Sequence, residues 1–285
     1  MSKKKIAWVT DSTAYITKEL RENDDVYVMP LAIIFPDRTF EDGIDLTTDE
    51  LYSRINSSKE VPKTSQPSVG RFAEVFEKLK AEYDHVIAVH VSGKLSGTIE
   101  SSRAGMEMAE LDGEIVDSQS MSYTITTLLY KGIQLAEQGV DYKEIAATLR
   151  EEALRSEKYV LLGSLDQFHK GGRMSKTQFL LGNLLQIKPI ITIKTTGEFD
   201  LFQKVRSEKK AVNRLIELLT EAMEKHHIND VQIMHGNVED KALELKKKIE
   251  EKYPHLNIVV GEISSTIAVH AGEGTVALIW HNEPK

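Results

Sequence analysis

The sequence predicts an α/β protein of two domains: an N-terminal doubly wound domain with a parallel sheet, then a C-terminal α+β domain with a mixed sheet. The first half repeats the order strand, loop, helix three times, which is typical of doubly wound folds. In the second half, strands follow one another without a helix between them. A chain of 285 residues, 41% of them hydrophobic, can fill two such cores. We place the domains at residues 1–155 and 156–285.

The first half contains three apolar runs of strand length. The run at 85–91 is rich in β-branched residues, as expected for a parallel strand buried on both faces. Helix 68–82 has an apolar stripe that predicts a core-facing side, and helix 121–138 ends before Gly139, which suits a C-cap. The expected strands are 6–10, 85–91 and 114–118, and the expected helices are 17–21, 49–56, 68–82, 98–110 and 121–138.

Strands dominate the second half, and two long helices lie among them. The turn Thr-Thr-Gly-Glu at 195–198 joins two adjacent strands and therefore predicts a β-hairpin. A hairpin together with strands separated by helices gives a mixed sheet with helices on one face. The expected strands are 160–162, 188–193, 199–205, 231–235, 258–263 and 276–280, and the expected helices are 208–225 and 239–251.

Composition argues against several classes of protein. The net charge of −8 disfavours nucleic acid as the partner, because phosphate backbones are bound by an excess of Lys and Arg. The chain has no Cys, so disulfides, thiolate metal ligands and a Cys nucleophile are ruled out. Its apolar runs are far shorter than the ~20 residues that cross a bilayer, and the N-terminus lacks a signal-peptide pattern. We therefore expect a soluble cytoplasmic protein.

Three short segments, at 64–68, 92–98 and 270–274, combine hydroxyl or imidazole donors with Gly or Pro. Such loops turn tightly and let a ligand approach the backbone. The segment at 92–98 follows a parallel strand, and doubly wound sheets bind ligands at the carboxyl ends of their strands. Converging neutral donors, with backbone N–H groups at Gly97 and the next helix N-terminus, would bind a carboxylate or phosphate.

Other interpretations of the same residues stay open. Thr64 and Ser68 would cap the helix at 68–82, Ser96 or Thr98 would cap the next helix, and His270 would be a core histidine.

A hydrolase using Ser96 and His270 is a further alternative, although Ser96 does not lie in a G-x-S-x-G motif. The histidine spacing does not indicate a metal site. The segment Lys170-Gly171-Gly172-Arg173 is either a phosphate nest or an interdomain turn with an exposed arginine.

Short motifs in a fixed order along nearly the whole chain resemble those of the DegV family. These are bacterial fatty-acid-binding proteins that include the binding subunits of fatty acid kinase. The motifs are Val9-Thr10-Asp11-Ser12-Thr13, Thr64-Ser65-Gln66-Pro67-Ser68, Leu95-Ser96-Gly97-Thr98, Val116-Asp117-Ser118, Gly171-Gly172-Arg173-Met174-Ser175, Ile187-Lys188-Pro189, Lys204-Val205-Arg206 and His270-Ala271-Gly272.

The resemblance implies that a long-chain fatty acid such as palmitate lies between the two domains. Its carboxylate would be held by the hydroxyls of Thr64 and Ser96 and the imidazole of His270, with help from the N–H of Gly97. Arg173 would lie near the head group, where it contacts a phosphate or a partner. Two departures from the family pattern are Glu273, where the family often has Pro, and Thr196-Gly197-Glu198 in place of an Asp-Gly turn.

The same resemblance implies a lipid-binding carrier for lipid transport or metabolism, not an enzyme acting alone. It would present the fatty acid to a separate kinase subunit that holds ATP, because this chain lacks a Walker motif and a kinase-type Gly-rich loop. We expect no cofactor, no metal, no nucleic acid, at most transient membrane contact, and a monomer. The alternative function is a hydrolase or phosphotransferase that uses Ser96 or His270 directly.

Overall fold

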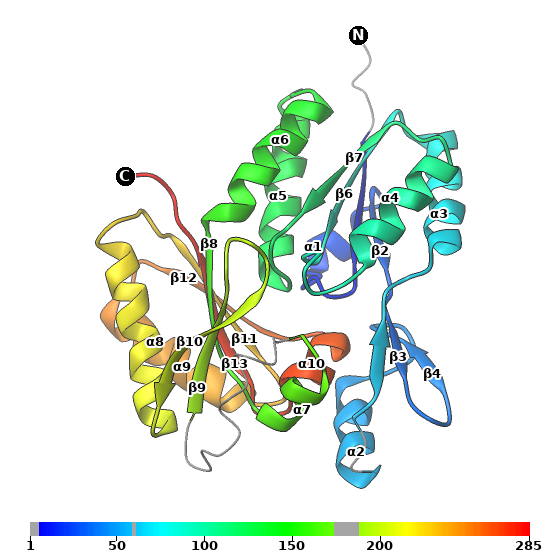
Figure 1. Ribbon diagram of the computed structural model, residues 1–285. Helices are drawn as coiled ribbons and strands as arrows, with labels where there is room; N and C mark the ends of the chain where they lie inside the picture. The colour runs from blue at the N-terminus through cyan, green and yellow to red at the C-terminus, as the bar shows by residue number, and fades with distance from the viewer. Residues whose placement is uncertain (1–5, 59–60, 174–187) are drawn as a thin grey trace. The chain divides into compact units, whose positions relative to one another are not determined.

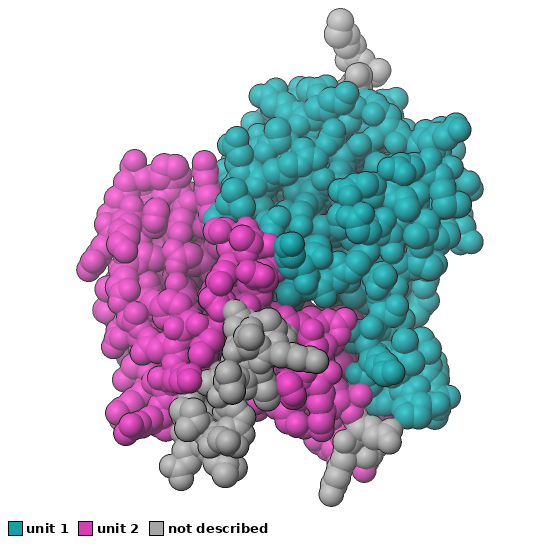
Figure 2. Space-filling view, in the orientation of Figure 1, with its two compact units in different colours: residues 1–47, 62–154 teal, residues 48–61, 155–285 magenta. Residues whose placement is uncertain are grey.

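The computed structural model describes residues 6–58, 61–173 and 188–285 (Figure 1). The chain divides into two compact units (Figure 2). The first contains Met1–Thr47 and Pro62–Leu154, and the second contains Thr48–Val61 and Arg155–Lys285. The short segment Thr48–Val61 thus belongs to the second unit, although the chain enters it from the first unit and returns there.

The first unit is built on a parallel four-stranded sheet in the order β2-β1-β6-β7. Chain order runs outward from β1 to β2 and then continues on the other side of β1, which is the doubly wound arrangement predicted. Strand β2 was not predicted. It is short, and only its last residue is buried. The strands are β1 (Ile6–Asp11), β2 (Val26–Met29), β6 (His85–His90) and β7 (Gly113–Asp117).

Helices cover both faces of this sheet (Figure 1). On one face, Phe72 and Phe76 of α3 and Met106 of α4 form a core with β1 and β6. On the other face α5 packs closely, because a Cβ atom on Gly132 would lie 2.5 Å from the Trp8 ring. The helices of this unit are α1 (Lys18–Arg21), α3 (Val69–Glu82), α4 (Thr98–Met108), α5 (Tyr123–Glu137) and α6 (Tyr142–Glu152).

The predicted C-cap at Gly139 is confirmed. Gly139 has φ 82°, and its N–H bonds to the carbonyl of Ala136 at 2.9 Å. The N–H of Val140 bonds to the carbonyl of Leu135 at 3.1 Å. These two bonds make a Schellman motif, which satisfies carbonyl groups at the end of α5.

A second, antiparallel sheet in the first unit was not predicted. Its order is β4-β3-β5, and its strands are β3 (Ala32–Ile34), β4 (Thr39–Glu41) and β5 (Lys63–Ser65). Three-residue strands are too short to give a period-2 pattern. The sheet matters here because β5 carries Thr64.

The second unit is built on the predicted mixed sheet, with six strands in the order β10-β9-β8-β13-β11-β12. Only β11 and β12 are parallel neighbours, and the predicted hairpin joins β9 to β10 through Gly197 at φ 85°. The strands are β8 (Ser156–Leu161), β9 (Lys188–Ile193), β10 (Phe199–Val205), β11 (Asp230–His235), β12 (Asn257–Glu262) and β13 (Val276–His281).

Helices α8 (Glu208–Met223) and α9 (Glu239–Lys252) pack on one face of this sheet, around a core that includes fully buried Trp280. Among its described residues, the unit has three further helices: α2 (Thr48–Ser58), α7 (Leu165–Lys170) and α10 (Ser265–Ala271). A single 3-10 turn, η1 (Ala153–Arg155), leads into β8. Within the described ranges, no helix has the length and apolar character needed to cross a membrane.

Candidate functional site

Thr64 and Ser96 both lie in the first unit, on two segments that contact each other. Thr64 is the middle residue of β5, where it pairs with Ile33 of β3. Ser96 and Gly97 lie between β6 and α4, at the carboxyl end of the parallel sheet. A Cβ atom on Gly97 would lie 2.9 Å from Nε2 of Gln66. The two segments therefore meet at Gln66. This residue lies in the motif at 64–68, but the sequence alone did not indicate a role for it.

The N-terminus of α4 presents backbone donors beside the hydroxyl of Ser96. Gly97 is the N-cap residue, so no N-cap side chain accepts a bond from these donors. Ser96 Oγ and Thr98 Oγ1 lie 2.8 Å apart and share a hydrogen bond. The first N–H groups of a helix lack partners within it, and the helix dipole favours negative charge there. The arrangement suits an oxygen of a carboxylate or phosphate.

Helix capping explains only one of the hydroxyls considered in the sequence. Ser68 caps α3, because its Oγ accepts a hydrogen bond from a backbone N–H of that helix at 3.3 Å. Thr64 lies four residues earlier, in a strand, and the N-cap of α4 is Gly97 instead of Ser96 or Thr98. The capping interpretation is therefore wrong for Thr64, Ser96 and Thr98.

A buried polar network supports the start of the loop that carries Ser96. Asp11, the last residue of β1, accepts a hydrogen bond from the N–H of Val91 at 2.8 Å and lies 3.1 Å from Nδ1 of His90. Nε2 of His90 lies 2.9 Å from Oγ of Ser102 on α4. The side chains of Asp11, His90 and Ser102 are fully buried. The network thus connects β1, β6 and α4 at the edge of the sheet where the loop begins.

His270 lies in the second unit, in the last turn of α10, where the sequence predicted a loop. The helix ends at Ala271, and Gly272 follows with φ 83°. The imidazole packs against the end of α7, because a Cβ atom on Gly171 would lie 2.3 Å from Nδ1 of His270. Burial, and then the charge of Arg173, lower the pKa of His270 from 6.5 to about 4. The imidazole is therefore neutral at pH 7.

The segment at 170–173 begins at Lys170, the last residue of α7, and both interpretations of it are wrong. The N–H groups of Gly171 and Gly172 bond to carbonyls of α7 at 2.8 and 3.1 Å, so they do not form a phosphate nest. Arg173 is partly buried, its Nη1 donates to the carbonyl of Gly171, and burial lowers its pKa. The motif residues Met174, Ser175 and Ile187 lie outside the described residues.

The loop after α10 is held by close packing and by the side chain of Glu273. Gly163 has no room for a side chain, because a Cβ atom there would lie 2.0 Å from the carbonyl oxygen of Glu273. The carboxylate of Glu273 accepts hydrogen bonds from Asn237 at 2.7 Å and from Asn56 at 3.3 Å. These contacts hold the loop in place without a proline, and the two asparagines donate hydrogen bonds to the negative charge that Glu273 introduces.

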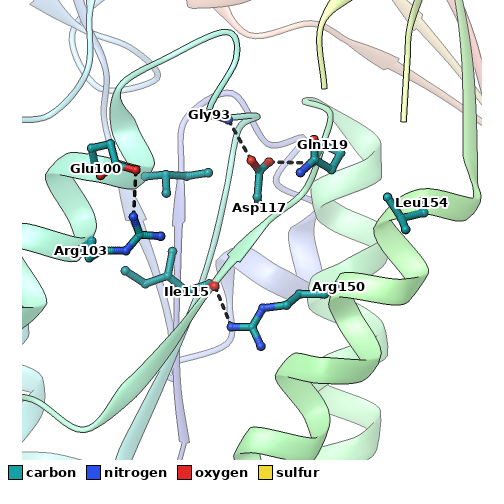
Figure 3. A pocket seen from close by; sticks show the side chains of 9 residues that line it. Gly93, Glu100, Arg103, Ile115, Asp117, Gln119, Arg150 and Leu154 are labelled. Carbon is teal, nitrogen blue, oxygen red and sulfur yellow. Dashed lines mark hydrogen bonds and ion pairs between the residues drawn. The ribbon is translucent and has the colours of Figure 1, made fainter. Parts of the chain in front are cut away.

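An open pocket of about 370 Å³ lies at the carboxyl end of β7 in the first unit (Figure 3). Its arginines have partners within the unit: Arg103 bonds to Glu100 at 2.9 Å, and Arg150 bonds to the carbonyl of Ile115 at 3.0 Å. The predicted site residues do not line it. Across the part of the chain that the structure describes, no cluster of His, Asp or Glu side chains could hold a metal ion.

The described structure therefore brings Thr64, Ser96 and Gly97 together in one unit, and His270 together with Arg173 in the other. Their joint action on a single ligand links residues of both units and stays a prediction.

Comparison with known proteins identifies the family. The family model described as "Uncharacterised protein, DegV family" matches residues 5–283. Protein DegV of Bacillus subtilis is 33% identical over 277 residues, which is 96% of this chain and 98% of that protein.

Solved structures give the same result. A fatty acid binding DegV family protein, SAG1342 from Streptococcus agalactiae, superposes with a TM-score of 0.91 at 30% identity over 99% of both chains. The Fatty Acid Kinase (Fak) B3 protein of Streptococcus pneumoniae, loaded with linoleic acid, has a TM-score of 0.85 at 23% identity over 98% of this chain and 100% of that one. This last likeness concerns the fold. With a family model that spans almost the whole sequence and a full-length relative one-third identical, the chain belongs to the DegV family.

Proposed function

We propose that this protein binds a long-chain fatty acid, with the carboxylate held by Thr64, Ser96 and His270 and the tail buried. The observation that carries the proposal is the donor set at the N-terminus of α4. Backbone N–H groups and the Ser96 hydroxyl lie together there at the carboxyl end of a doubly wound sheet. The relative from Streptococcus agalactiae, which is 30% identical, is described as fatty acid binding.

The donors are matched to a carboxylate that keeps its charge. Hydroxyl and backbone N–H groups donate hydrogen bonds to an anion without carrying a full positive charge. His270, neutral at pH 7, offers one further ring N–H. A bound carboxylate would favour the protonated ring, so it would raise the pKa of His270 from its low value in the free protein. Orientation of the head group thus comes from several weak donors, not from one ion pair.

Affinity comes from the tail. A C16 chain has about 14 methylenes, and burying them at ~0.8 kcal/mol each contributes at most about 11 kcal/mol before the ordering costs. Transfer of the free acid into water is therefore slow, and delivery requires an opening movement, a partner or a membrane surface.

We further propose that the protein presents this fatty acid to a separate ATP-binding kinase subunit and does not phosphorylate it alone. Arg173 supports the idea, because its partly buried guanidinium lies close enough to His270 to lower the pKa of that imidazole. A guanidinium in this position would steady the negative charge of an acyl phosphate or contact the partner. We also propose that the protein is cytoplasmic and monomeric. Size-exclusion chromatography with light scattering will test the monomeric state.

Mass spectrometry of an organic extract of the denatured protein tests the function. We expect about one fatty acid per chain, and weaker binding of added palmitate in Thr64→Val, Ser96→Ala and His270→Ala. Each variant loses a hydrogen bond to a charged group, which costs ~1.5–3 kcal/mol, or roughly 10- to 150-fold in affinity.

Matched controls are Thr148→Val at a half-buried position and Ser57→Ala and His255→Ala at exposed positions, which should bind as the parent does. An empty extract together with no binding of palmitate would exclude the carrier function. Turnover of an ester or phosphate by the chain alone would instead favour an enzyme that uses Ser96 or His270.

A further inference from the structure

Helix α2 is set apart by its place in the chain. The residues before it and after it belong to the first unit, whereas α2 itself belongs to the second. Within the second unit it packs against α10, the helix that ends next to His270. Its position is therefore maintained by side-chain contacts with the second unit. Several of these contacts are polar.

Beside the buried Leu51 and Ile55, polar contacts run along one stripe of α2, formed by Thr48, Tyr52 and Asn56 at spacings of four residues. Residues four apart lie on the same face of a helix. Thr48 donates a hydrogen bond to the carboxyl of Glu262 at the end of β12. Asn56 donates to the carboxylate of Glu273 at 3.3 Å. The helix is thus fastened at both ends to carboxyl groups.

Between these two bonds, the hydroxyl of Tyr52 is buried without a hydrogen-bond partner among the described residues. The tyrosine is 3% exposed, and its hydroxyl lies 2.8 Å from where a Cβ atom on Gly236 would be. Burial, then the charges of Glu262 and Glu273, raise the pKa of Tyr52. A buried hydroxyl without a partner costs free energy, so the middle of the stripe opposes docking while both ends favour it.

An open hollow also borders the helix. A hollow of about 310 Å³ lies between α2 and the start of α7, bordered by Asn56, Ser164, Asp166 and Glu273. The 11-residue helix is docked by the buried side chains of Leu51 and Ile55 together with these two polar bonds, and the unpaired hydroxyl opposes that docking.

Movement of α2 would change the contacts of the loop next to His270. Glu273, which binds Asn56, lies three residues after His270, in the loop that leaves α10. The backbone of this loop is packed tightly, because a Cβ atom on Gly272 would lie 2.4 Å from Oε1 of Gln167. Releasing Asn56 removes one of the two amides that bind the Glu273 carboxylate.

We propose that α2 is a detachable cover on α10, fastened by Thr48 and Asn56, and that its release is a step in ligand exchange at the His270 end of the site. The second part of this inference rests on the proposed fatty acid binding, whereas the first part does not. The occupant of the surface on α10 is thus a segment of the chain itself.

Hydrogen exchange measured by mass spectrometry tests the detachment directly. An isolated helix of 11 residues is marginal in water, so α2 loses its amide protection each time it undocks. In the wild-type protein we expect α2 to exchange faster than α3, which is packed in the core of the first unit. Asn56→Ala should raise the exchange rate of α2 by roughly three- to tenfold, because it removes a bond to a charged acceptor.

Two variants of the same helix make the test specific. Tyr52→Phe removes the unpaired hydroxyl and should slow exchange of α2, which is the opposite sign from Asn56→Ala. Ser57→Ala is the matched control, because its exposed hydroxyl bonds to the Arg54 carbonyl within α2 itself. Exchange of α2 only together with α3, or shifts of the same sign in Asn56→Ala and Tyr52→Phe, would overturn the detachable cover.

The rate at which palmitate leaves the protein, with excess albumin as acceptor, tests the second part. We expect Asn56→Ala to release palmitate faster, Tyr52→Phe to release it more slowly, and Ser57→Ala to match the parent. Dissociation rates that stay constant while exchange of α2 changes would overturn the link to ligand exchange. If the protein does not bind palmitate, the proposed function fails, and hydrogen exchange alone still decides whether α2 detaches.

Discussion

Adding one methyl group at Gly171 should displace His270 and weaken ligand binding while leaving the fold intact. The backbone at this position has φ −64°, which alanine adopts without strain. The new Cβ atom would lie 2.3 Å from Nδ1 of His270, whereas an ordinary contact begins at 3.4 Å. The ring must therefore move by about 1 Å. Crowding of this kind costs ~1–3 kcal/mol in stability, and a lost hydrogen bond to the carboxylate weakens binding roughly 10- to 150-fold.

The assay combines palmitate affinity with unfolding followed by tryptophan fluorescence. The chain has two tryptophans, Trp8 in the first unit and Trp280 in the second, so a Trp8→Phe background reports only on the unit that contains His270. Gly70→Ala, in the first unit, is the control for affinity, because a Cβ atom there meets nothing within 4 Å.

Removing the imidazole should relieve the clash, so the stability cost of Gly171→Ala should disappear in a His270→Ala background. Parent-like affinity for palmitate in folded Gly171→Ala protein would refute His270 as a ligand contact. A stability cost that persists without the imidazole would refute the packing of the ring against Gly171.

Two further predictions concern titration and packing. Because burial and Arg173 lower the pKa of His270 from 6.5 to about 4, the contribution of this group to stability is complete above pH 6.5. This contribution decreases as the pH falls through 4, by at most about 3 kcal/mol. NMR titration should show a higher pKa of His270 when palmitate is bound. A ring that titrates near 6.5 in the free protein would contradict this. Gly132→Ala should destabilise the first unit by about 1–3 kcal/mol in a Trp280→Phe background, because its Cβ atom would lie 2.5 Å from the Trp8 ring; unchanged unfolding would contradict that packing.

The parallel sheet of the first unit was predictable because its strands are buried on both faces. The strand at 85–91 is apolar over most of its length, and β6 is buried at all six of its positions. Helix α6 shows that usable signals can also be overlooked. Its buried residues Tyr142, Ile145, Ala146 and Leu149 follow helical spacing after the N-cap Asp141, and yet this helix was not predicted.

Other elements could not have been found from periodicity. Helices α7 and α10 have six and seven residues, and the strands of the small antiparallel sheet have three. Such segments are shorter than the window that distinguishes helix from strand. The two helices depend on the N-caps Ser164 and Ser264, and all of these segments depend on tertiary packing. This is why His270 was assigned to a loop although it lies in a helix.

The candidate site is a predicted set of residues, and its contacts could not be predicted from the sequence. Hydroxyl and imidazole donors next to Gly or Pro selected three segments, and the resemblance to the DegV family then indicated Thr64, Ser96 and His270 within them. The contact between Gln66 and Gly97 and the bonds of Glu273 to Asn56 and Asn237 join residues that are far apart in sequence. No local pattern contains information of this kind.

The order Ser102, His90, Asp11 resembles the triad of a serine hydrolase, and it bears on the enzymatic alternative. The three side chains are linked by contacts of 2.9 and 3.1 Å, but each is fully buried, and the ring of Phe72 packs edge-on against His90 at 5.4 Å. A nucleophile must touch its substrate, whereas these groups touch only the protein. Asp11 also accepts the N–H of Val91, directly before the loop that carries Ser96. In this fold, therefore, Ser102, His90 and Asp11 hold in place the loop that carries Ser96, and none of the three side chains is exposed as a nucleophile.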